Sequence, residues 1–140
     1  MSYAHVVEAG STVSLSGVSC NPPEGMTKAE AKQLRRGFAE EVEELQEMMY
    51  ATRQPALLCV FQGMDCAGKD GAINRVLQYV NVQSVRVKSF KVPTKRELAQ
   101  DYLWRIHQHA PPQGGITIFN RSHYEDVLVV RVHSLVPESV

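Results

Sequence analysis

The stretch ALLCVFQGMDCAGKDGAINRVLQY, residues 56–79, decides the fold. It begins with a short, continuous apolar run, Ala56 to Phe61, which is typical of a strand covered on both faces in a parallel sheet. After a turn that contains glycine, apolar residues recur three and four positions apart, which predicts a helix from Lys69 to about Tyr79. A strand, a glycine loop and a helix therefore follow one another directly.

The loop in this stretch has the spacing G-x-x-x-x-G-K of a Walker A motif, with Gly63, Gly68 and Lys69 at the defining positions. In such a loop the glycines let backbone N–H groups converge on phosphate oxygens, and the next helix presents its positive end. A purely structural turn has the same pattern, but the flanking strand and helix favour a phosphate site. The expected phosphate-binding residues are Gly63, Met64, Cys66, Ala67, Gly68, Lys69 and Asp70.

Two carboxylates, one in the loop and one directly after it, are considered as ligands for a metal ion. Asp65 would face bound phosphate, which is costly unless a divalent cation or a proton lies between them, so Asp65 is a candidate Mg²⁺ ligand. The alternative is a turn-forming Asp that caps the loop backbone. Asp70 stands where the motif expects a Ser or Thr that binds magnesium, and an acidic residue in the first helical turn is also favoured by the helix dipole.

The rest of the chain alternates between helix and strand. The further expected elements are a helix at 27–52, a strand at 84–90, a helix at 94–109, a strand at 116–119 and a helix at 122–135. Each of these helices opens on a capping box, and the boxes are Thr27 with Glu30, Thr94 with Glu97, and Ser122 with Glu125. The valines of the last segment favour a strand instead, but its capping box favours the helix.

This order predicts an α/β fold, in which a parallel sheet carries helices on its two faces. We expect an irregular arm at 1–26 and a partial P-loop kinase-like domain at 27–140. The first helix has an apolar stripe that we interpret as a packing face, made of Leu34, Phe38, Val42, Leu45 and Met49.

A polar cluster follows the strand at 116–119. Ligands of open α/β sheets bind beyond the carboxyl ends of the strands, so this cluster is expected beside the P-loop. Arg121 is a candidate to clamp a transferring phosphoryl group, and Glu125 or Asp126 to hold Mg²⁺ or its waters. A Walker B strand usually ends in Asp, whereas this one ends in Asn120.

Composition limits the remaining possibilities. The 140 residues are 44% hydrophobic with a formal net charge of zero, which suits one ordinary globular domain. No apolar run approaches the roughly 20 residues that span a bilayer, the N-terminus does not resemble a signal peptide, and the 3 cysteines lack metal-ligand spacing. We therefore expect a cytoplasmic protein without membrane or nucleic-acid partners. Residues 53–140 hold 11 Lys/Arg against 7 Asp/Glu, an excess that suits an anionic ligand but equally a solvated face.

Four blocks of this sequence, in the same order, resemble polyphosphate kinase 2: GMDCAGKDGAINRV, SFKVPTKREL, DYLWRIHQHAPP and IFNRSHYEDVLVVRVH. The resemblance runs from about Thr27 to Pro137. It implies a P-loop kinase fold that uses inorganic polyphosphate and Mg²⁺ to phosphorylate nucleoside mono- or diphosphates, or runs in reverse, and the form of the last block is most similar to the branch that accepts AMP as well as ADP.

The resemblance also implies roles for single residues. Asp65 and Lys69 fall in the Walker A site, Asn120 and Arg121 at the Walker B position, and Glu125 close to the acceptor phosphate. Catalysis is expected of Asp65, Lys69 and Arg121, and metal binding of Asp65 and Asp126. Lys88, Lys91 and Lys95 surround the second strand, where solvated lysines are the commoner explanation.

Members of that family are longer, and their other part supplies a lid and further strands. We therefore expect a truncated P-loop sheet in which the first strand keeps an open apolar edge, which invites strand addition or a partner such as a second copy. Three functions stay open at this point: a polyphosphate:nucleotide phosphotransferase, a fragment that only binds phosphate polymers or other subunits, and an ATP-dependent nucleoside monophosphate kinase.

Overall fold

A computed structural model describes residues 6–19, 21–22 and 24–134 of the chain. The chain divides into two compact units, Met1–Arg35 and Arg36–Val140, and the division falls inside helix α1, Lys28–Thr52. Among its described residues, the first unit holds the 3₁₀ turn η1 at Leu15–Gly17 and the beginning of α1. The second unit holds the sheet and all candidate site residues.

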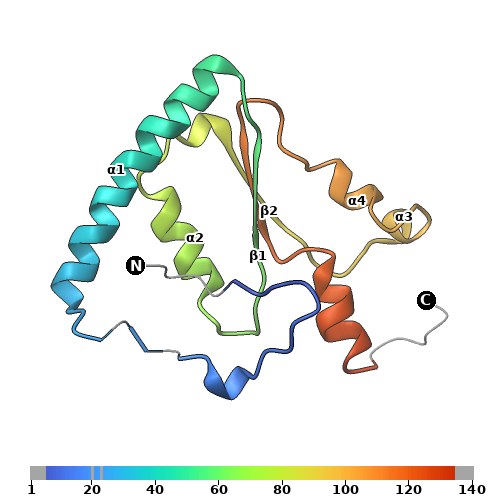
Figure 1. Cartoon of the computed structure of the whole chain (residues 1–140). Helices are drawn as coiled ribbons and strands as arrows, with labels where there is room; N and C mark the ends of the chain where they lie inside the picture. Colours follow the sequence, from blue (N-terminus) through green and yellow to red (C-terminus); the bar gives the residue numbers. More distant parts are fainter. Residues whose placement is uncertain (1–5, 20, 23, 135–140) are drawn as a thin grey trace. The chain divides into compact units, whose positions relative to one another are not determined.

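The sheet has three parallel strands in the order β1-β3-β2, which confirms the predicted α/β class (Figure 1). Their bounds are Leu57–Phe61 for β1, Val85–Ser89 for β2 and Ile116–Asn120 for β3. Asn120 pairs with Phe61 on one side and with Ser89 on the other. Because all three strands end at this level, the segments that follow them leave the sheet at one edge.

Helices cover both faces of the sheet. On one face Met49 of α1 and Ile73 of α2, Lys69–Leu77, pack against Ile116 and Ile118 of β3. On the other face, Phe119 packs against Phe90 and against Ile106 of α4, Trp104–His107. The rings of Phe90 and Phe119 meet edge to face at 4.8 Å, a favourable aromatic geometry. Two small cores thus hold β3 from both sides.

The prediction that residues 56–61 form a strand buried on both faces is wrong in one respect. The strand is present as β1, but it lies at the edge of the sheet, and Leu57, Leu58 and Val60 are 40–45% exposed. The fully covered strand is β3, where Ile118 and Phe119 are each 1% exposed. The open apolar edge that we expected for the first strand is confirmed.

The segment at 94–109 is two short helices instead of one. Thr94 and Glu97 form the predicted capping box, but this helix, α3, covers only Lys95–Leu98. Asp101 then makes a local turn, because its side chain accepts a hydrogen bond from the backbone N–H of Leu103 and its carbonyl accepts one from Trp104. A second helix, α4, begins after this turn.

The last segment is helical, as predicted, but differs in form. Its regular part, η3 at Asp126–Arg131, is a π-helix, and the predicted end at Leu135 lies outside the described residues. Ser122 accepts a hydrogen bond from the N–H of Tyr124, while the carboxylate of Glu125 binds other side chains. The predicted capping box therefore does not form. In the described part of the chain, no helix is long and apolar enough to cross a membrane.

Helix α1 has the predicted length and capping box, but its apolar stripe is largely uncovered. Met49 is buried, whereas Leu34, Phe38, Val42 and Leu45 are 39–56% exposed. Met49 packs in the core with Ile73, Ile116 and Ile118, whereas a packing partner for the rest of the stripe stays a prediction.

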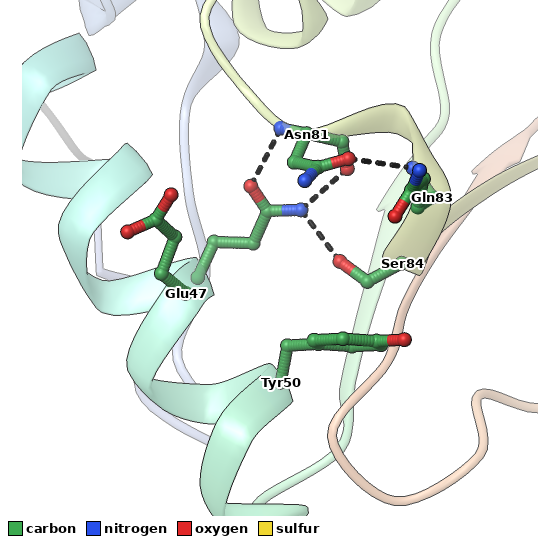
Figure 2. A pocket seen from close by; sticks show the side chains of 6 residues that line it. Glu47, Tyr50, Asn81, Gln83 and Ser84 are labelled. Atoms are coloured by element: carbon green, nitrogen blue, oxygen red, sulfur yellow. Dashed lines mark hydrogen bonds between the residues drawn. The ribbon is translucent and has the colours of Figure 1, made fainter.

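A buried glutamine anchors α1 to the segment before β2. Gln46 is 2% exposed, and its side-chain amide donates to the carbonyl of Asn81 and to Oγ of Ser84, both at 2.6 Å. Its Oε1 accepts from the N–H of Asn81 at 2.8 Å. Figure 2 shows these bonds beside the small hollow that Glu47 and Tyr50 also line. Every polar atom of the amide group is thus engaged.

Replacement of Gln46 by Leu is expected to lower the free energy of unfolding by about 2 kcal/mol or more, because it leaves buried polar groups without partners. The measurement is chemical denaturation followed by circular dichroism. Glu47→Gln is the matched control, since Glu47 is the exposed neighbour, and should change stability by less than about 0.5 kcal/mol. Equal stability of the two variants would contradict the anchoring role.

Candidate active site

The glycine loop between β1 and α2 has the backbone that a phosphate cradle needs. Gly68 has φ +88°, the left-handed region that only glycine enters without strain, and it is the N-cap of α2. Cys66 also has a positive φ, +62°. The N–H of Ala67 donates to the carbonyl of Met64 at 3.1 Å and closes the turn. The loop therefore ends with its chain directed into the helix N-terminus, where unpaired N–H groups attract anions.

Lys69 folds back over this loop. Its Nζ donates to the carbonyl oxygens of Gly63 and Met64, at 2.7 Å each. The ammonium group therefore rests on two neutral acceptors of the loop backbone.

The end of β3 is tied to the loop by side chains. Asn120 donates from Nδ2 to Oδ1 of Asp70 at 2.5 Å, which links the central strand to the first turn of α2. The backbone N–H of Arg121 donates to the carbonyl of Phe61 at 3.0 Å and extends the pairing of β1 and β3 by one step. Asp70 thus serves as a structural acceptor in this chain.

Arg121 lies between two carboxylates. Its Nη2 is bonded to Oδ1 of Asp65 in the loop, and its Nη1 to Oε1 of Glu125 at 2.6 Å. Its backbone has φ +65°, a left-handed conformation that costs a residue with a side chain free energy. Such strain is common at functional sites, and here it turns the guanidinium toward the P-loop.

These groups surround one cavity of about 540 Å³. It lies at the carboxyl edge of the sheet, where ligands of open α/β sheets bind. Its ionisable lining comprises Asp65, Lys69, Asp70, Lys91 and Arg121, and the other lining residues are Cys66, Gly68, Gly71, Ser89, Phe90, Val92 and Asn120. The cavity thus combines the P-loop, the end of β3 and the segment after β2.

Glu125 and Asp126 are not part of the cavity lining. The side chain of Glu125 is 21% exposed and lies behind Arg121, where it is bonded. Burial raises the pKa of Asp126 above its usual value, although the charge of Arg105 opposes this effect. The pKa of Tyr102, whose hydroxyl donates to the carbonyl of His123, is raised by burial and by the nearby charge of Asp126.

Sequence reasoning missed the contribution of Ser89, Phe90 and Val92 to this cavity, and it missed Gln62. For Ser89, Phe90 and Val92 the available signal was the end of the second strand, since parallel strands share an edge at their carboxyl ends. Among the three lysines near β2, Lys91 lines the cavity, whereas Lys88 lies over the ring of Phe90 at 5.7 Å and Lys95 belongs to α3.

Known proteins share this sequence and architecture. Residues 25–139 match the profile of the polyphosphate kinase 2 family. An AMP/ADP-polyphosphate phosphotransferase of Meiothermus ruber is 60% identical over 99 residues, which are 71% of this chain and 37% of that protein. An ADP-polyphosphate phosphotransferase of Rhodopseudomonas palustris is 47% identical over 107 residues, 76% of this chain and 37% of that protein.

The crystal structure of polyphosphate kinase 2 from Arthrobacter aurescens TC1 superposes with a TM-score of 0.83 at 38% identity, covering 95% of this chain and 48% of that one. The chain therefore spans less than half the length of these relatives. The family profile matches it almost from the start of α1 to the end of the chain, and the P-loop and the polar end of β3 lie within the match. By this match and this fold, the chain belongs to the polyphosphate kinase 2 family.

Proposed function

We propose that this chain carries the phosphate site of a phosphotransferase that moves a phosphoryl group between inorganic polyphosphate and AMP or ADP. The observation that carries the proposal is the convergence of Lys69, Arg121 and the P-loop on one cavity of about 540 Å³. The substrate class is supported by the names of the two relatives reported above, which are polyphosphate phosphotransferases for AMP and ADP or for ADP.

The residues of this cavity suit direct in-line transfer. Phosphoryl transfer requires little covalent chemistry from the protein, and catalysis comes from positioning and from stabilisation of negative charge. The loop N–H groups and Lys69 would hold one phosphate group, while Arg121, on the opposite wall, would neutralise charge on the transferred group. Lys91 adds a third cation to the same cavity.

The donor set fits Mg²⁺ that is held largely by substrate phosphates. Mg²⁺ usually takes one or two protein carboxylates and completes its shell with water and phosphate oxygens. Asp65 is 80% exposed and Asp70 lies beside it in the lining, while no group of three or more His, Cys, Asp or Glu that could hold a metal occurs in the described residues. Bound there, Mg²⁺ would offset the charge of the phosphates, with Asp65 as its protein ligand.

The direct test is product formation. Purified protein is incubated with Mg²⁺, polyphosphate and either AMP or ADP, and nucleotides are separated by ion-exchange chromatography. ADP or ATP should appear only when polyphosphate is present. Transfer from ATP to AMP without polyphosphate would instead identify a nucleoside monophosphate kinase, and polyphosphate binding in calorimetry without product would identify a phosphate-binding module.

Lys69→Ala and Arg121→Ala are each expected to lower turnover by about a hundred- to a thousandfold, because each removes a cation that stabilises the transition state. Lys32→Ala is the control, since this lysine is exposed on α1 and lies outside the cavity. Rates are compared at saturating polyphosphate. Variants with wild-type turnover would remove Lys69 and Arg121 from the mechanism.

Asp65→Asn should raise the Mg²⁺ concentration that gives half-maximal rate, because a neutral amide is a weaker ligand for this hard cation than a carboxylate. The measurement is a Mg²⁺ titration of turnover. Asp126→Asn tests the second metal ligand expected from the sequence; since Asp126 does not line the cavity, its titration should match the wild type. An effect of Asp126→Asn as large as that of Asp65→Asn would contradict this assignment.

Asp126→Asn is also expected to change the dependence of stability on pH. Because burial raises the pKa of Asp126 in the folded state above its ordinary value of 3.8, ionised Asp126 destabilises the fold at neutral pH. Protonation relieves this cost as the pH falls through the folded pKa. The variant should therefore be more stable than the wild type at pH 7, and the difference in unfolding free energy should shrink toward about pH 4. If the difference in unfolding free energy between Asp126→Asn and the wild type grows as the pH falls, the expected direction is contradicted.

A further inference from the structure

Gln62, the first residue after β1, is a polar side chain that the proposed reaction does not use. Its Nε2 donates to Oε2 of Glu125 at 2.5 Å. Its Oε1 accepts a longer hydrogen bond, 3.3 Å, from Oγ of Ser122, which is 3% exposed. These two contacts fix which end of the amide faces the carboxylate, since Ser122 supplies a donor and ionised Glu125 offers only acceptors.

Glu125 transmits this position to Arg121. One of its oxygens is bonded to Gln62 and the other to Nη1 of Arg121 at 2.6 Å. The side chain of Glu125 is 21% exposed, so a partner is important to hold it at this place. The chain of contacts thus runs from the end of β1 through Glu125 to the guanidinium, which faces Asp65 in the P-loop.

Gln62 and Glu125 do not line the cavity, whereas Arg121 does. A direct contact of Gln62 with a phosphate is therefore not part of this arrangement. The amide instead prevents Glu125 from rotating away, and Glu125 prevents the long arginine side chain from sampling other rotamers. Such fixation matters because a displacement of about 1 Å can cost about a hundredfold in rate.

We propose that Gln62 is a positioning residue that sets the place of the Arg121 guanidinium by holding Glu125 from behind. The inference rests on the proposed function, in which Arg121 neutralises charge on the transferred phosphoryl group.

The test begins with Gln62→Glu, which puts a second carboxylate against Glu125 at a contact that now measures 2.5 Å. Repulsion between the carboxylates should displace Glu125 and release Arg121, lowering turnover about ten- to a hundredfold at pH 8. Gln100→Glu, at an exposed glutamine, is the matched control and should leave turnover unchanged.

Two further variants separate positioning from a general structural effect. Gln62→Glu combined with Glu125→Gln reverses donor and acceptor, and it should recover most of the lost turnover. In an Arg121→Ala background, Gln62→Glu should lower turnover by less than about a further twofold, because a residue that acts through Arg121 has nothing left to position. The proposal is overturned if Gln62→Glu lowers turnover as much in the Arg121→Ala background as in the wild type. It is also overturned if the exchanged pair recovers no turnover.

Turnover and tripolyphosphate affinity are both measured below the unfolding midpoint of every variant, so that loss of folded protein does not mimic the effect. If the wild type neither forms product nor binds tripolyphosphate, the proposed function fails. If the wild type forms product or binds tripolyphosphate, and Gln62→Glu gives the same value as Gln100→Glu in that assay, only the positioning role fails.

Discussion

The parallel pairing of β3 with both of its neighbours is the constraint on which the site depends. Ile118 and Phe119 are almost fully buried, each facing one of the two cores, so β3 has no freedom to slide. A slip of β3 by one residue would turn each of its side chains to the opposite face of the sheet, so that each would meet the wrong core. The fixed register sets Asn120 between Phe61 and Ser89, and therefore brings the P-loop, Arg121 and Phe90 to one edge.

The loop and the polar end of β3 could be predicted because their signals are local. The Walker A spacing, the strand before it and the helix after it are all read within 24 residues, and the positive φ of Gly68 follows from the turn that this motif requires. The capping boxes of Thr27 and Thr94 are equally local, and both form. Local chemistry therefore decides where this loop and these helices begin, while the pairing of β3 decides how they meet at the candidate site.

The errors at β1 and at the last helix share a physical cause, which is the influence of contacts between distant residues. Ser122 and Glu125 have the spacing of a capping box, but the carboxylate is taken by Arg121 and by Gln62, which is 63 residues away in sequence. The guanidinium offers the carboxylate an opposite charge, which a single backbone N–H does not. The edge position of β1 likewise depends on strand order, which the composition of a single strand does not encode. Gln62 gave no signal because its partner is known only once β1 and β3 are paired.

Lys69 and Arg121 both have partners before any ligand binds, and these partners differ. Lys69 rests on two neutral carbonyl groups, so a phosphate that replaces them gains a full charge interaction. Arg121 rests on two carboxylates, and a phosphate in the cavity would compete with Asp65 for it. A divalent cation would help this exchange, because it attracts the released carboxylate and the incoming phosphate together. Glu125, held from behind by Gln62, would keep the guanidinium in place while its other partner changes.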